Sequence, residues 1–75
     1  MIPAKSISQT PKFPYAVLSV RKGQDVAELE SSFWLQSKAE DMFSSQYSKW
    51  GLPDTNFYLV DWDKQTILKT HEVWS

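Results

Sequence analysis

Apolar and polar positions alternate in the first half of the chain in a way that predicts a β-hairpin. Residues 15–21 form a β-branched and aromatic run. Residues 26–35 then place Ala27, Leu29, Phe33 and Leu35 on one side at a period of two, which is typical of a half-buried strand. A helix over residues 26–35 is the alternative, but it separates the apolar positions from the polar ones less cleanly.

The turn between these two segments supports the same pairing. Both a two-residue loop at residues 22–23 and a four-residue loop at residues 22–25 place the even-numbered apolar residues of the first strand on the face of Ala27 and Leu29. Only a loop with an odd number of residues would break this agreement. We therefore expect residues 15–21 and 26–35 to pair.

The pattern changes to helical spacing in the middle of the chain. Ser37 and Glu40 fit a capping box, and Gly51 followed by Pro53 is a typical helix end, so we expect a helix over about residues 38–50. Its apolar stripe recurs every three or four residues. The stripe consists of Ala39, Met42, Phe43, Tyr47 and Trp50.

Two further strands are predicted in the last third of the chain. Residues 56–62 are apolar at both parities, and residues 66–73 form a returning strand after a turn at residues 63–65. The pattern does not decide which parity of residues 56–62 faces the helix. Either Phe57 and Leu59 face the helix, or Tyr58, Val60 and Trp62 do.

These elements predict an α+β fold. We expect a flexible N-terminal arm over residues 1–12 and a single β-β-α-β-β domain over residues 13–75, with a four-stranded antiparallel sheet in the order 2-1-3-4 and the helix on one face. Apart from the N-terminal arm, no segment is long enough to cover the opposite face. We therefore expect that face to be open.

An open face with aromatic side chains is a candidate binding surface, because exposed apolar patches often mark contact sites and Trp and Tyr are frequent hot spots. Aromatic residues make up 15% of the chain, including four Trp. The alternative is that large rings fill a thin core. The residues that we predict to contact a partner are Tyr15, Val17, Glu28, Glu30, Trp34 and Trp62.

Composition narrows the classes of function. With no Cys and a single histidine, His71, the chain offers neither a disulfide nor a thiolate or histidine cluster for zinc. Two Gly cannot form a glycine-rich phosphate loop. We expect no enzyme activity, no cofactor and no metal. Lacking a signal-peptide pattern and a membrane-spanning run, the chain is expected to be cytoplasmic.

The sequence therefore favours a small non-catalytic protein-binding module, a regulator or inhibitor of a larger assembly. It would act through the open face or an added edge strand, with Glu28 and Glu30 favouring a basic partner surface. Two alternatives are single-stranded nucleic-acid binding by sheet aromatics, which these two carboxylates disfavour, and a homodimeric structural subunit. The order of elements over residues 13–74 resembles that of small phage-encoded inhibitors, which implies a regulator of phage or mobile-element type but assigns no residue a role.

Overall fold

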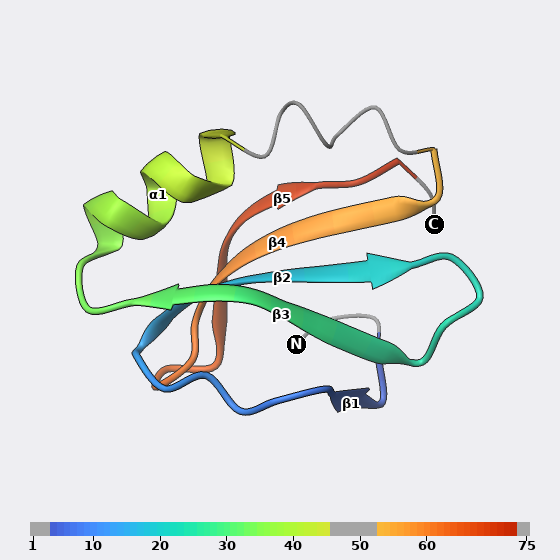
Figure 1. Cartoon of the computed structure of the whole chain (residues 1–75), viewed down its shortest axis with the longest axis horizontal. Coiled ribbons are helices and arrows are strands. Elements are labelled where there is room, and N and C mark those ends of the chain that lie inside the picture. Colours follow the sequence, from blue (N-terminus) through green and yellow to red (C-terminus); the bar gives the residue numbers. More distant parts are fainter. Residues whose placement is uncertain (1–3, 46–52, 74–75) are drawn as a thin grey trace.

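The computed structural model describes residues 4–45 and 53–73. Within these ranges the sheet has the strand order β1-β3-β2-β4-β5, and the helix lies against one of its sides (Figure 1). The predicted α+β class is confirmed. The elements are β1 (Ser6–Ile7), β2 (Tyr15–Arg21), β3 (Val26–Phe33), α1 (Gln36–Ser45), β4 (Thr55–Asp61) and β5 (Thr66–His71).

The four predicted strands lie side by side in the predicted order, but the sheet has a fifth strand that was not expected. Strand β1 pairs parallel with the start of β3, so the predicted count of four strands and the wholly antiparallel pairing were wrong. The backbone N–H of Lys5 donates to the carbonyl of Asp25, and that of Ser8 donates to the carbonyl of Ala27, each at 2.8 Å. A strand of two residues is too short to produce an alternating pattern. The flexibility of residues 1–12 stays a prediction.

Residues 22–25 connect β2 and β3, which is the longer of the two loops that the sequence pattern allowed. Its turn contains Gly23 at a φ of +86°, and the N–H of Gln24 donates to the carbonyl of Arg21 at 3.0 Å. Leu18 stands opposite Leu29, as the longer loop predicts. The helical alternative for residues 26–35 is thereby excluded.

A β-bulge in β3 changes the phase of this hairpin. Val17 pairs with Ser31 and Leu18 pairs with Leu29, which leaves Glu30 as the extra residue. Beyond the bulge, Phe33 stands opposite Tyr15 and packs on the helix side of the sheet. The prediction that Ala27, Leu29, Phe33 and Leu35 share one face was wrong, because it assumed an unbroken alternation.

Helix α1 begins earlier than predicted. The N–H of Ala39 donates to the carbonyl of Leu35 at 3.2 Å, so Leu35 occupies the N-cap position and Ser37 lies within the first turn rather than capping it. Ala39 and Phe43 are buried, as the predicted stripe requires, and Met42 is half-buried. The other stripe residues and the predicted helix end lie outside the described residues.

Apolar clusters cover both sides of the sheet. Phe57 and Leu59 face the helix, which answers the question that the sequence left open. The buried helix-side cluster consists of Val17, Ala39, Phe43, Phe57 and Leu59. The buried cluster on the opposite side consists of Ala16, Leu18, Val20, Ala27, Tyr58 and Val60.

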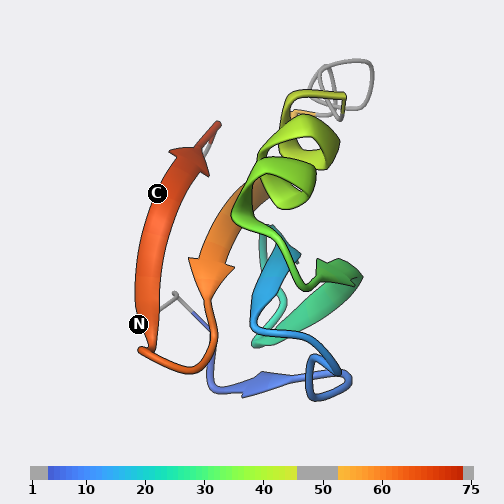
Figure 2. The ribbon, with the colours of Figure 1, turned by 90° about the vertical axis from the view of Figure 1, so that its left-hand side faces the viewer.

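The side opposite the helix is not open as predicted. Each of its clustered core residues is at most 1% exposed. The sheet curls strongly (Figure 2), so that Ile7 of the first edge strand and Ile67 of the last both pack against this cluster, together with Ala4 and Trp62. The curl of the sheet and the segment before β2 thus cover the side opposite the helix. The alternation within the predicted strands did not indicate this cover.

Candidate functional site

Over residues 4–45 and 53–73, the most exposed large apolar side chains lie at the corner between β3 and α1. Trp34 is 69% exposed and Leu35 is 59% exposed. The ring of Phe13 lies 5.1 Å from the Trp34 ring between centroids, at an interplanar angle of 49°. Phe13, Trp34 and Leu35 form what we call the corner patch. Lys12 borders it, with its Nζ atom 5.9 Å from the centroid of the Phe13 ring.

Local structure explains why this patch is exposed. Trp34 and Leu35 are the two residues between the end of β3 and the start of α1, so the backbone must change direction there. The nearest apolar residues on either side pack in the core: Phe33 lies in the helix-side cluster, and Ala39 is completely buried. Trp34 and Leu35 lie at the turn between these two positions and remain exposed.

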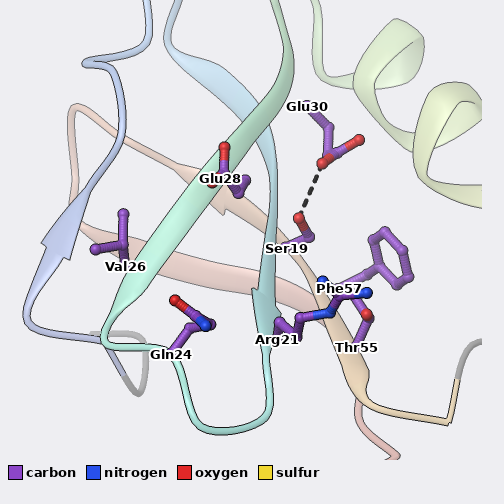
Figure 3. A pocket seen from close by; sticks show the side chains of 8 residues that line it. All are labelled: Ser19, Arg21, Gln24, Val26, Glu28, Glu30, Thr55 and Phe57. Atoms are coloured by element: carbon purple, nitrogen blue, oxygen red, sulfur yellow. Dashed lines mark hydrogen bonds between the residues drawn. The ribbon is translucent and has the colours of Figure 1, made fainter.

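A groove of about 660 Å³ lies on the helix side of the sheet, across the ends of β2, β3 and β4 (Figure 3). Strands β2 and β4 supply buried residues to it, among them Ser19 at 6% and Phe57 at 2% exposure. Strand β3 supplies two exposed carboxylates and one exposed valine. The groove is lined by Ser19, Arg21, Gln24, Val26, Glu28, Glu30, Thr55 and Phe57.

Hydrogen bonds orient the carboxylates in and beside the groove. The hydroxyl of Ser19 donates to Oε2 of Glu30 at 2.8 Å (Figure 3), and the hydroxyl of Thr55 donates to Oδ1 of Asp54 at 3.0 Å. The Nε atom of Arg21 donates to Oδ2 of Asp54 at 3.0 Å, which pairs the cation of the groove with a carboxylate. The Thr55 hydrogen bond is the largest effect on the pKa of Asp54 and lowers it below its ordinary 3.8. Desolvation opposes this effect, and the charge and hydrogen bond of Arg21 lower the pKa further.

The structure separates the six predicted contact residues into different environments. Val17 is fully buried beneath the helix, and Tyr15 is half-buried beside the same cluster, so the prediction that these two lie on an uncovered face was wrong. The assignment failed because the helix packs on the odd-numbered residues of β2 rather than the even-numbered ones. Trp62 is half-buried and packs against the opposite cluster.

The remaining three predicted residues are accessible. Glu28 and Glu30 line the groove, and Trp34 is the most exposed member of the corner patch. Glu30 lies on the bulge, and Trp34 follows the end of β3, so the predicted single surface is divided into two sites along one strand. Whether any of these residues binds a partner stays a prediction.

Sequence reasoning missed the other residues of these sites, among them Leu35, Phe13 and Arg21. Leu35 was assigned to the core by its parity in an uninterrupted strand, and Phe13 was placed outside any element. The contribution of Arg21 to the groove depends on its long-range pairing with Asp54, 33 positions along the chain. The only local signal was that both residues border predicted strands.

Over residues 4–45 and 53–73 the structure contains no group of three or more His, Asp or Glu side chains placed to hold a metal ion. Within the same ranges, no helix has the length and apolar character needed to cross a membrane. Comparison of the chain with protein-family models, with curated proteins and with solved structures found no match.

Proposed function

We propose that this chain is a non-catalytic module that binds another protein through the corner patch. The observation that carries the proposal is the exposure of Trp34 and Leu35, at 69% and 59%, side by side in a chain that buries its other core-forming residues on both sides of the sheet. Exposed clusters of large apolar side chains mark contact surfaces more often than isolated ones do. Tryptophan is also among the residue types most enriched at binding hot spots.

The patch is supported on three sides, which favours binding. Strand β3 holds the backbone before Trp34, helix α1 holds the backbone after Leu35, and Phe13 packs against the indole ring. A side chain that is already positioned loses less conformational entropy when a partner covers it. We therefore expect the patch to act as a preformed anchor.

The form of this function that we favour is a regulator or inhibitor of a larger assembly, which acts by covering a partner surface. Such a mode needs no reacting group on this chain. A cytoplasmic site of action is part of the proposal and fits the lack of Cys. Nucleic acid is a less suitable partner, because Glu28 and Glu30 face the groove and repel a phosphate backbone.

Site-specific photo-crosslinking tests the proposal. A photoreactive phenylalanine analogue replaces Trp34 in one variant and Lys64, in the exposed β4–β5 turn, in a matched control. We expect position 34 alone to give a discrete adduct with one protein in cells that produce the chain. Excess wild-type protein should suppress the adduct, whereas the Trp34→Ala/Leu35→Ala double variant should not.

Three results would overturn the proposal. Position 64 could capture the same protein as efficiently as position 34. The double variant could compete as well as the wild type does. A crosslink only to a second copy of this chain would assign the corner patch to a homodimer instead.

A further inference from the structure

The groove on the helix side combines one exposed apolar side chain with two carboxylates. Val26, which is 37% exposed, contributes apolar surface, and Glu28 and Glu30 contribute negative charge (Figure 3). Lysine and arginine have the complementary structure, because an apolar stem carries their cationic head. The shape of the lining thus fits a basic side chain better than an anion or a wholly apolar group.

Among the lining residues that the structure describes, the cation of Arg21 does not offset this preference. Arg21 forms its ion pair with Asp54, and that carboxylate is held in turn by the hydroxyl of Thr55. The pair is neutral as a unit, so Arg21 does not offset the negative charge of Glu28 in the described part of the lining. Ser19 holds the carboxylate of Glu30 in position before any ligand arrives.

The position of the groove relates it to the corner patch. Glu28 lies near the start of β3 and Trp34 directly follows its end. Six residues of extended chain span about 20 Å. One protein surface of ordinary size can therefore contact both sites, since a standard interface buries roughly 800 Å² on each partner.

We infer that the groove receives a lysine- or arginine-bearing segment of the protein partner, with its cation between the carboxylates of Glu28 and Glu30 and its apolar stem against Val26. This inference rests on the proposed function, because it assigns the partner's chemistry at a second contact of the same interface. The partner therefore carries an apolar pocket for Trp34 and a basic segment beside it.

A titration followed by amide NMR tests the groove without knowledge of the partner. The probe is an acetylated heptapeptide of alternating alanine and lysine, and the control is the same peptide with glutamate in place of lysine. We expect the lysine peptide alone to shift the amide resonances of residues around Glu28, Arg21 and Thr55. The apparent affinity should fall as salt is raised, because exposed ion pairs are screened.

A pair of charge-matched variants makes the test specific. Glu28→Gln/Glu30→Gln should weaken peptide binding about 5- to 10-fold, as expected for two partly exposed ion pairs. Asp41→Asn/Asp63→Asn changes the net charge equally at exposed positions outside the groove and should leave binding within about twofold. Because Glu30 also accepts the Ser19 hydrogen bond, Glu28→Gln alone serves as a second variant and should weaken binding about two- to threefold.

Equal weakening by both double variants, or resonance shifts centred outside the groove, would overturn the inference. Binding of spermidine with the same affinity, without any peptide binding, would also overturn it. The crosslink from position 34 does not involve these carboxylates. The peptide titration can therefore disprove the inference about the groove while the crosslink still supports binding through the corner patch, and the reverse is also possible.

Discussion

Polar side chains on β2 and β4 are buried together with a hydrogen-bond partner. Ser19, Thr55 and Asn56 are 6%, 8% and 1% exposed. The first two donate to carboxylates at the groove, and Asn56 donates from Nδ2 to the hydroxyl of Tyr58 at 3.2 Å. Its Oδ1 accepts from the N–H of Val73 at 2.6 Å. Asn56 therefore links Val73, two residues beyond the end of β5, to strand β4.

Replacement of Asn56 by alanine should lower the free energy of unfolding by about 1–3 kcal/mol, because it leaves buried polar groups without their partner. Denaturant unfolding measures the change. Gln24→Ala, in the exposed β2–β3 turn, is the control and should remain within about 0.5 kcal/mol of the wild type. A similarly small effect of Asn56→Ala would contradict the role of this side chain as a fastening.

The ion pair at the groove should contribute to stability in a pH-dependent way. The Thr55 hydroxyl and the Arg21 charge lower the pKa of Asp54 in the folded state below its ordinary 3.8. Its contribution is therefore present above the unfolded-state pKa and is lost as the pH falls through the folded-state pKa. Asp54→Asn should melt below the wild type at pH 7, and the difference should shrink and vanish as the pH falls below 3.8 and through the lowered folded-state pKa. Thermal melts over this range test the sign, and a difference that grows on acidification would be inconsistent with it.

At the scale of elements, the bulge at Glu30 decides which side chains meet. It lets Leu29 pack opposite the helix while Phe33 packs beneath it. The periodicity of the sequence predicted strands β2 to β5, their order and the hairpin register. The periodicity could not predict the bulge. Apolar residues occur at alternate positions both before and after Glu30, so the sequence looks the same with or without an extra residue there.

Deletion of Glu30 should be tolerated better than a deletion in an ordinary strand. The remaining residues can pair without a bulge and keep Leu29 opposite Leu18 and Phe33 opposite Tyr15. We expect a folded protein that loses less than about 2 kcal/mol, a loss within the common range for single changes. Deletion of Val17, which pairs with strands on both sides, is the control and should prevent folding. Circular dichroism and denaturant unfolding provide the comparison, and an unfolded Glu30 deletion would refute the proposed register.

At the scale of the whole molecule, the curled sheet has an apolar cluster on each side, and the segment around β1 closes one of them. This closure could not be predicted, since Ile7 is a single apolar residue between polar ones and packs only through long-range contacts. The same limit applied to the candidate site. Trp34, Glu28 and Glu30 were expected to be accessible from parity and residue type, and all three are exposed. Val17 was misassigned because parity alone does not show which side the helix covers, and Leu35 because β3 ends at Phe33.

A charged residue in place of Ile7 should expose the apolar cluster that β1 covers. Ile7→Asp places a carboxylate against a buried apolar surface and should cost at least about 2 kcal/mol, with increased binding of a hydrophobic dye. Ser6→Asp, at the neighbouring exposed position of the same strand, is the matched control and should have little effect. Equal stability of the two variants would contradict the closure of this side by β1.

The central claim is that the corner patch serves binding rather than folding, and the Trp34→Ala variant tests it most directly. Its affinity for the protein captured from position 34 and its free energy of unfolding are measured side by side. We expect affinity to fall at least about 30-fold, as for a hot spot of about 2 kcal/mol, while unfolding changes by less than about 0.5 kcal/mol. Unchanged affinity, or a loss of stability large enough to unfold the chain, would contradict the claim.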